Sequence, residues 1–292
     1  MVTIRLKAGM GNQMFQYAFG LNMAHALKTD LRIDLSLLLD RARGEEHVYR
    51  NYDLTIFNVP QDFTISPTLL RTLYKTKSSK ICKLTRKWIE RNKNYVKEPH
   101  FHLSKDILNN PKDNTIYEGW WQSEDYFSDI APEIRKVFTF VHPILEESKD
   151  LLKKIKDTNS VCLNVRRTDF LKVDTLNTTN KNYFFKAAKH MAEKVENPVF
   201  YIFSDDVEWC RKNIILDYPT EIVEHKHKGI KFGNYMQLMI ACKHFIIPNS
   251  SYAWWAVWLC ENKEKIVIAP KIWFNDSAID TSDLVPDSWI RL

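Results

Sequence analysis

The stretch VCLNVRRTDF, residues 161–170, decides the fold class, because it begins as a strand-like apolar run and ends in charged residues. Four further strand-like runs follow it, at 199–204, 220–224, 244–248 and 265–270. Helix-like segments separate these runs, at 181–195, 207–213, 234–242 and 251–262. Strands that are apolar throughout and alternate with helices are typical of a parallel sheet covered on both faces. The second half of the chain is therefore predicted to be an α/β domain.

The start of the chain shows the same alternation of strands and helices. A strand-like run at 2–6 is followed by the turn-like AGMGN, a helix-like segment at 13–27 and a second strand-like run at 31–35. Residues 40–150 show no regular pattern. We predict two α/β domains, 1–150 and 151–292, joined near 140–158.

The composition is that of an ordinary soluble globular protein. Of the 292 residues, 45% are hydrophobic and 27% are charged. The longest apolar run, 252–260, is much shorter than the roughly 20 residues that a bilayer-spanning helix needs. The N-terminus lacks the basic start and apolar stretch of a secretory signal, and the five cysteines include no C-x-x-C pair. These features predict a cytoplasmic protein with reduced cysteines.

The positive charge is concentrated in one segment. Residues 71–97 hold ten Lys or Arg against one Glu, whereas the whole chain carries a net charge of only +6. This concentration argues against a general nucleic-acid-binding protein. Residues 77–97 can form a helix with Ile81, Leu84 and Trp88 on one face, which would suit peripheral contact with the inner face of a membrane or with an anionic acceptor. A solvated basic helix packed on its own domain is the alternative.

Two adjacent arginines stand where an open α/β sheet binds its ligands, just after the carboxyl end of a strand. Arg166 and Arg167 follow the run 161–165. Adjacent guanidinium groups can clamp a diphosphate, because each presents fixed donors and neither loses its charge. The alternative is a pair of surface arginines bonded to Asp169 and to glutamate side chains.

Two further strand ends carry polar groups. Asn249, Ser250 and Ser251 lie between a strand and a helix, where they can cap the helix while its first N–H groups bind an anion. Asp205 and Asp206 follow another strand, and one of them can accept a hydrogen bond from a ribose hydroxyl or a base N–H. The alternative for this acidic pair is a helix start that stabilises the helix dipole.

The N-terminal motif GMGNQM contains part of a dinucleotide-binding fingerprint. The full pattern requires a glycine where Met14 stands, although Asp34 partly fits the expected ribose-binding acid. A NAD-dependent oxidoreductase is therefore an alternative function. Gly11, Asn12 and Gln13 remain candidate ligand-binding residues, because a glycine turn lets the backbone approach a ligand closely.

No resident metal is predicted. The chain contains no Asp-x-Asp motif, and the nearest approach to one is the run from Asp206 to Glu208. His225 and His227 lie in a basic loop without a third ligand at a suitable spacing, and are expected to be solvated.

Taken together, these stretches resemble the α1,2-fucosyltransferases of glycosyltransferase family 11. The matching segments follow the family's order: GMGNQMFQYA at 9–18, YEGWWQSEDYF at 117–127, VRRTDF at 165–170, FYIFSDDVEWCRKN at 200–213, MQLMIACKHFIIPNSSYAWWAVWL at 236–259 and KIVIAPKIWF at 265–274. The resemblance implies a GT-B-like architecture with two Rossmann-like domains facing across a cleft. GDP-fucose would bind the C-terminal domain, and an oligosaccharide or surface polysaccharide would bind the N-terminal domain.

The resemblance also assigns roles to residues. Related fucosyltransferases share an H-x-R-R-x-D-like motif whose first arginine contacts the donor pyrophosphate, a role that carries over to Arg166. Asn164 stands where that motif has its histidine, near the nucleotide; asparagine keeps donor and acceptor atoms but cannot be charged. The implied reaction is an inverting, metal-independent transfer of L-fucose to a galactoside hydroxyl, with Arg167 and Asp169 beside Arg166 in the catalytic site.

The general base is less defined. Glu124 and Asp125, in the aromatic stretch of the acceptor domain, are candidates, and surface solvation is the alternative for both. Besides the oxidoreductase, two other functions stay open: a glycosyltransferase that uses another nucleotide sugar, and a non-catalytic glycan-binding protein that retains the fold.

Overall fold

The computed structural model describes residues 1–39, 49–64 and 94–292, which form two compact units. Unit 1 comprises Met1–Thr139 together with Ser282–Leu284, and unit 2 comprises Phe140–Thr281 together with Val285–Leu292. The short C-terminal piece joins unit 1 through the Asp283 carboxylate, which accepts a hydrogen bond from the Leu103 N–H. The break after Thr139 lies earlier in the chain than the predicted boundary at residue 150.

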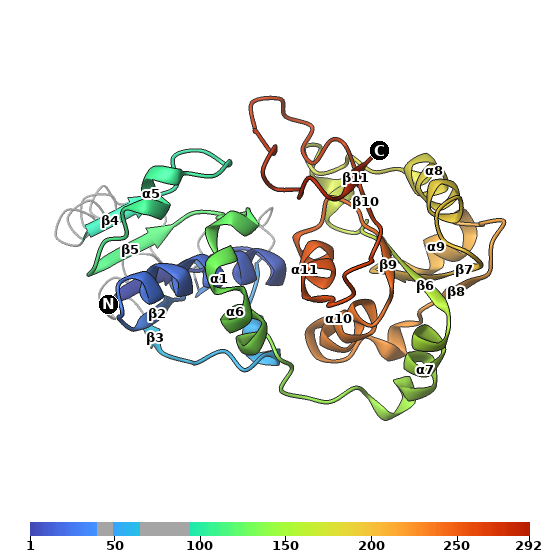
Figure 1. Cartoon of the computed structure of the whole chain (residues 1–292), viewed down its shortest axis with the longest axis horizontal. Coiled ribbons are helices and arrows are strands. Elements are labelled where there is room, and N and C mark those ends of the chain that lie inside the picture. Colours follow the sequence, from blue (N-terminus) through green and yellow to red (C-terminus); the bar gives the residue numbers. More distant parts are fainter. Residues whose placement is uncertain (40–48, 65–93) are drawn as a thin grey trace. The chain divides into compact units, whose positions relative to one another are not determined.

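Unit 1 is built on a parallel sheet with the strand order β3-β2-β1-β5-β4 (Figure 1). Strand β1 (Val2–Arg5), helix α1 (Met10–Ala26) and strand β2 (Leu31–Asp34) form the βαβ unit that the sequence predicts. Because α1 already begins at Met10, Gly11 lies inside its first turn and not in a glycine loop. The residue with a left-handed backbone at this connection is Ala8, whose φ is 63°.

The middle of unit 1 is more regular than the sequence predicts. Strand β5 pairs with β1 near the centre of the sheet, and β4 lies beside it at the edge. The further elements of the unit are α2 (Ser36–Leu39), η1 (Leu54–Ile56), β3 (Phe63–Thr64), β4 (Asn94–Lys97), α5 (Lys105–Asn109), β5 (Thr115–Glu118), η2 (Glu124–Tyr126), η3 (Ser128–Ile130) and α6 (Ala131–Val137). Strand β5, TIYE, is short and polar at both ends, which explains why its pattern did not stand out, although all four residues are buried.

An aromatic cluster forms the core beside β5. The Trp121 ring stacks on Phe19 of α1, with centroids 3.8 Å apart, and Tyr126 packs edge-on against both rings. Trp121 is completely buried and has a left-handed backbone, with φ at 55°. Burial of a whole indole in this cluster stabilises an otherwise unfavourable backbone conformation.

Unit 2 is built on a parallel sheet with the strand order β11-β10-β9-β6-β7-β8. Its strands are β6 (Asn159–Val165), β7 (Pro198–Ser204), β8 (Thr220–Ile222), β9 (His244–Ile246), β10 (Val267–Ala269) and β11 (Ile290–Arg291). Its helices are η4 (Glu146–Ser148), α7 (Lys149–Asp157), η5 (Phe170–Lys172), α8 (Lys181–Ala192), α9 (Val207–Asn213), η6 (His225–His227), η7 (Ile230–Phe232), α10 (Gly233–Ile240) and α11 (Ser251–Leu259). The five predicted strands and four predicted helices are confirmed, and the two-residue β11 is additional.

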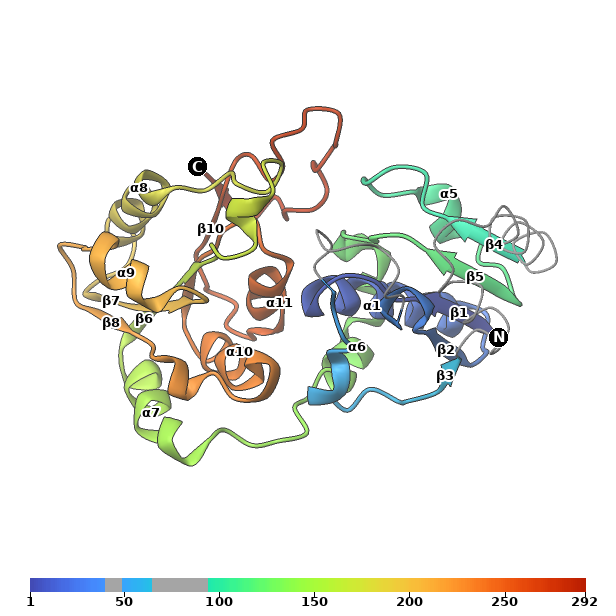
Figure 2. The same cartoon turned by 180° about the vertical axis from the view of Figure 1, so that it is seen from behind.

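Both faces of the second sheet are covered, as its apolar strands require. Helices α8 and α9 lie on one face, whereas α10 and α11 lie on the other (Figure 2). Alternate residues of β6, such as Val161 and Leu163, join the core under α8 and α9. Helix α11 is buried almost all round, with Trp254 and Trp255 fully enclosed, which fits its lack of a polar face.

The basic segment can be described only at its end. Residues 77–93 of the predicted basic helix lie outside the described residues, and Asn94–Lys97 form strand β4, so the helix prediction is wrong for these four residues. Among the described residues, the structure contains no helix with the length and apolar character needed to span a bilayer. Peripheral membrane contact stays a prediction.

Candidate active site

The strand order of unit 2 locates its ligand-binding edge. From β6 the chain proceeds through β7 to β8 on one side, and from β9 through β10 to β11 on the other. The two halves of the sheet therefore diverge between β6 and β9. In open α/β sheets, ligands bind at this topological switch point, outside the carboxyl ends of the strands. The predicted residues Arg166 and Asn249 follow β6 and β9, so they flank it.

Arg166 forms two ion pairs at this edge. Its Nη2 lies 2.7 Å from Asp169 Oδ1, and its Nη1 lies 3.1 Å from Asp205 Oδ2. The side chain remains 27% exposed, and its guanidinium also lies over the Phe170 ring. Two carboxylates thus orient the guanidinium, which has five N–H donors and keeps some of them for a ligand.

Asp205 holds the loop that carries Arg166. Its Oδ1 accepts a hydrogen bond from the Arg167 N–H at 3.0 Å, and its Oδ2 accepts one from the Thr168 N–H at 3.1 Å and another from the Thr168 hydroxyl. The carboxylate is mostly buried. Since both of its oxygens bind this loop, Asp205 positions Arg166. The contact of Asp205 with a ribose or a base stays a prediction.

Arg167 points to a different partner. Its guanidinium carbon lies 3.6 Å from the centre of the Trp209 ring on α9, and its Nε lies 3.3 Å from Asp206 Oδ2. Asp206 also caps α9, because its Oδ1 accepts a hydrogen bond from the Trp209 N–H. The two adjacent arginines therefore have separate surroundings, and the joint clamp on a diphosphate stays a prediction.

Two of the polar residues after β9, Asn249 and Ser250, are buried, and Ser251 is partly exposed. Asn249 donates from Nδ2 to the carbonyl oxygens of Leu176 and Trp273 at 2.9 and 2.8 Å, while its Oδ1 has no hydrogen-bond partner among the residues that the structure describes. Ser250 caps α11 by accepting from the Ala253 N–H, and Ser251 is the first residue of that helix. Helix α11 therefore begins just after the carboxyl end of β9, a position where the free N–H groups of a helix N-terminus can bind an anion.

Asn164 lies in β6, at the position where the related motif has histidine. It is buried, and its Nδ2 donates to the Phe203 carbonyl of β7 at 3.1 Å. The amide thus links the two strands beside Arg166 and Asp205. The role of Asn164 toward a nucleotide stays a prediction.

Several side-chain contacts within unit 2 were not apparent from the sequence. The Tyr252 hydroxyl donates to the Phe232 carbonyl at 2.7 Å, and Phe232 has a left-handed backbone at the start of α10. His225 contacts the Ser204 carbonyl through Nε2 at 3.1 Å. His227 is buried and contacts the Ser148 hydroxyl through Nδ1, so the prediction of a solvated side chain is wrong for this histidine.

Unit 1 contains the other candidate residues. Gln13 is completely buried: its Nε2 donates to the carbonyls of Ala8 and Asn51, and its Oε1 accepts from the Asp53 N–H. These bonds assign Gln13 a structural role. Asn12 is partly exposed and accepts a hydrogen bond from Gln122.

Glu124 and Asp125 begin the turn η2, in which the Ser123 hydroxyl accepts from the Asp125 N–H at 3.3 Å. Glu124 is partly exposed and Asp125 is exposed. Accessibility is compatible with the predicted role of a base, and the role itself stays a prediction.

The sequence profile of Glycosyl transferase family 11 matches residues 51–292. The chain belongs to this family. Family 11 membership makes the protein a glycosyltransferase and is incompatible with the oxidoreductase interpretation of the GMGNQM motif. The match spans all of unit 2 and the part of unit 1 that follows its βαβ start.

Full-length relatives agree with the family assignment. The chain is 31% identical to an Escherichia coli alpha-1,2-colitosyltransferase, over 100% of this chain and 98% of the relative. It is 29% identical to the Escherichia coli O-antigen biosynthesis glycosyltransferase WbnK, over 98% and 99%. The mouse galactoside 2-alpha-L-fucosyltransferase Sec1 is 24% identical over 89% of this chain and 64% of its own length.

Solved structures support the fold of this family 11 member. The chain superimposes on Arabidopsis thaliana FUT1, solved as a mutant in complex with GDP, with a TM-score of 0.51 and 10% identity. The alignment covers 98% of this chain and 74% of the plant protein. The α/β class and the two Rossmann-like units of a GT-B enzyme are therefore confirmed.

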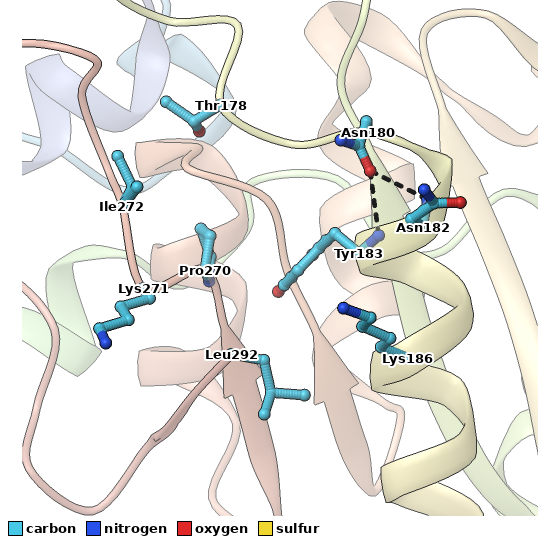
Figure 3. Close-up of a pocket in the computed structure, with 9 residues that line it drawn as sticks. All are labelled: Thr178, Asn180, Asn182, Tyr183, Lys186, Pro270, Lys271, Ile272 and Leu292. Atoms are coloured by element: carbon cyan, nitrogen blue, oxygen red, sulfur yellow. Dashed lines mark hydrogen bonds between the residues drawn. The ribbon is translucent and has the colours of Figure 1, made fainter.

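The family 11 enzyme has a cavity in unit 2, with a volume of about 410 Å³ (Figure 3). It is lined by Thr178, Asn180, Asn182, Tyr183, Lys186, Pro270, Lys271, Ile272 and Leu292. Tyr183 extends from α8 toward Pro270, and its hydroxyl donates to the Ile247 carbonyl at 2.6 Å. None of these lining residues is a predicted site residue, so the donor site is assigned from the switch point instead.

Sequence patterns did not indicate the buried carboxylate of Glu98, which directly follows β4. It accepts hydrogen bonds from the Trp120 N–H at 2.5 Å and the Trp121 N–H at 3.0 Å. Burial raises the pKa of Glu98 to about 7, although these two N–H groups and the Lys7 ammonium oppose the shift. Glu98 thus carries a proton at mildly acidic pH, where a solvated glutamate is ionised.

We expect the stability of the enzyme to fall as pH rises through this range. Below the unfolded-state pKa of 4.5, Glu98 is protonated in both states; between 4.5 and 7, only the folded state keeps the proton. As the pH rises through this range, the free energy of unfolding therefore falls by up to about 3 kcal/mol. Urea unfolding at pH 5 and pH 8 measures the loss, and Glu98→Gln should show a correspondingly smaller difference. Equal pH dependence in both proteins would contradict the buried, protonated carboxyl.

Proposed function

We propose that the enzyme transfers L-fucose from GDP-fucose to the 2-hydroxyl of a galactoside in an oligosaccharide or surface polysaccharide, with inversion at the anomeric carbon. The observation that carries the proposal is the placement of Arg166 at the β6/β9 switch point, oriented by Asp169 and Asp205. Support comes from family membership and from relatives whose names specify α1,2 transfer and galactoside acceptors.

The proposed chemistry requires stabilisation of a leaving diphosphate. The acceptor oxygen bonds to the sugar C1 while GDP departs from the opposite face, so negative charge develops on the pyrophosphate. The hydroxyl proton passes to a base, for which Glu124 and Asp125 are the candidates. Arg166 donates N–H groups to that charge, and the first N–H groups of α11, after Ser250, add a positive dipole end. Both donors are fixed before the reaction, which lowers the cost of reorganisation in the transition state.

No metal takes part in the proposed reaction, since the guanidinium and the helix N-terminus would neutralise the diphosphate. Among the described residues, the structure shows no group of three or more His, Cys, Asp or Glu side chains that could hold an ion. We expect EDTA to leave the initial rate of transfer within about twofold of its value in Mg²⁺. A loss of activity in EDTA that added Mg²⁺ or Mn²⁺ restores would contradict the proposal.

Colitose is the second candidate for the transferred sugar, because a relative of 31% identity is a colitosyltransferase. Colitose lacks the 3-hydroxyl of fucose, so a donor site that hydrogen-bonds this hydroxyl would discriminate between the two sugars.

The test is incubation of the enzyme with GDP-fucose, GDP-colitose, GDP-mannose and a UDP-sugar, each with a panel of β-galactosides. Product linkage is then determined by NMR. We expect transfer from GDP-fucose and an α1,2-linked product. Transfer only from GDP-colitose would show that colitose is the transferred sugar. Transfer only from a UDP-sugar would overturn the proposal. Protection of the folded state by GDP, measured as a rise in melting temperature, reports nucleotide binding independently of turnover.

A further inference from the structure

The sheet of unit 1 has a switch point of its own. From β1 the chain proceeds through β2 to β3 on one side, whereas β5 and β4 lie on the other side of β1. The halves diverge between β1 and β5. Lys7 follows β1 by two residues and Trp120 follows β5 by two residues, so these two side chains flank the position where such a sheet binds its ligand.

An exposed aromatic ring lies at this position. Trp120 is 37% exposed, whereas Tyr117, Trp121 and Tyr126, which lie close to it in the sequence, are buried. Lys7 Nζ lies 4.1 Å from the centre of the Trp120 ring and covers one face of it. An indole offers an apolar face together with a polar N–H, which is why tryptophan is enriched at binding interfaces.

The backbone around Trp120 is held rigidly. The Trp120 N–H donates to Glu98 Oε2, and the next residue, Trp121, is locked into the core by stacking on Phe19. Gly119 has no room for a side chain, because a Cβ there would lie 2.5 Å from the Trp121 ring and 2.6 Å from Glu98 Cβ. A backbone fixed in this way loses little conformational entropy when a ligand binds to the side chain that it carries.

The chemistry of the surface selects its ligand. A flat aromatic face beside polar groups suits a sugar ring, since one face of a galactopyranose presents C–H groups while its hydroxyls point outward. The partly exposed Asn12, held by the Gln122 amide, lies in the first turn of α1 after the same switch point. The ligand site of unit 1 does not need a cationic group for a diphosphate, because the donor site is assigned to unit 2.

We propose that Trp120 is the stacking platform for the acceptor galactoside, with Lys7 on one face of its ring and Glu98 holding its backbone. This inference rests on the proposed function for its choice of galactoside, and it places acceptor recognition in unit 1.

The kinetic test uses Trp120→Ala and Trp120→Phe in the full chain. We expect Trp120→Ala to raise the KM for the galactoside at least tenfold, with the kcat and the KM for the donor within about twofold of wild type. The galactoside KM of Trp120→Phe, which keeps a smaller ring, should lie between the values of wild type and Trp120→Ala. Ile215→Ala removes an exposed apolar side chain in unit 2, after α9, and serves as the matched control with unchanged constants.

A binding test without donor separates this inference from the proposed function. Saturation-transfer NMR with methyl β-galactoside should show strong transfer to the ring protons of one face in wild type and loss of the signal in Trp120→Ala. Circular dichroism and the GDP-induced shift in melting temperature show whether the variant is folded. A wild-type galactoside KM or NMR signal in folded Trp120→Ala would overturn the platform. Galactoside binding that needs Trp120, without turnover of any nucleotide sugar, would support the platform and overturn the proposed transfer.

Discussion

Replacement of Arg166 by alanine is expected to reduce kcat on the order of 10²–10³-fold while the protein stays folded. The guanidinium is the cation that Asp169 and Asp205 orient at the β6/β9 switch point, and removal of one preorganised donor from a developing charge has effects of this size. Since the charge grows as GDP leaves, kcat should fall more than the KM for the donor rises. Steady-state kinetics with GDP-fucose and a galactoside measure both constants.

Arg166→Lys is the matched control for charge. Lysine retains the positive charge but loses the planar fork that can bind two phosphate oxygens, so we expect activity between those of wild type and Arg166→Ala. The GDP-induced shift in melting temperature should shrink in both variants. Near-normal turnover by a folded Arg166→Ala would refute the assignment. If Arg166→Ala does not fold, turnover of Arg166→Lys decides, and a wild-type kcat in that variant would count against the need for the planar fork.

The strands of unit 2 could be predicted because they are buried on both faces. Runs such as VCLNV and VFYIFS are apolar throughout, and the parallel sheet is the structure that encloses such runs. In unit 1, strand β4, NYVK, lies at the sheet edge and is partly exposed, so it shows neither a continuous apolar run nor a clear alternation. A strand of four mixed residues therefore has no pattern that local reasoning can detect.

The position of the arginine site was predictable, but its partners were not. The sequence suggested Asp169 and glutamate side chains as partners. The register of β6 against β7 instead pairs Val165 with Ser204 and thereby brings Asp205 to the loop after Arg166. The separate surroundings of Arg167, which stacks on Trp209, likewise depend on where α9 packs. Contacts between strand ends arise from pairing across the sheet, which neighbouring residues do not encode.

Glu98 illustrates the same limit in unit 1. Nothing near it in the sequence suggests burial, because it lies between the charged Lys97 and Pro99 and precedes a histidine-rich turn. Its environment arises when the loop after β5 closes over the end of β4 and presents two backbone N–H groups. The raised pKa of Glu98 is therefore a property of the fold and not of the local sequence.

The second large effect is expected at Asp205, which touches the loop of Arg166 through four interactions. In Asp205→Ala, the N–H groups of Arg167 and Thr168 lose their acceptor, the Thr168 hydroxyl loses its partner, and Arg166 keeps only one carboxylate. Hydrogen bonds to a charged acceptor contribute about 1.5–3 kcal/mol, so we expect a loss of stability of about this size. A displacement of the guanidinium by about 1 Å would reduce kcat on the order of a hundredfold.

Asp206→Ala tests whether this effect is specific, because the neighbouring carboxylate caps α9 and pairs with Arg167 without bonding to the loop backbone. We expect it to cost about 1 kcal/mol, the usual contribution of a helix cap, and to reduce kcat far less than Asp205→Ala. Urea unfolding gives the stabilities, and transfer kinetics on the folded fraction give kcat. Asp205→Asn, which keeps one acceptor oxygen, should recover part of the loss. Equal effects of the two alanine variants on kcat would show that Asp205 stabilises the unit without positioning Arg166.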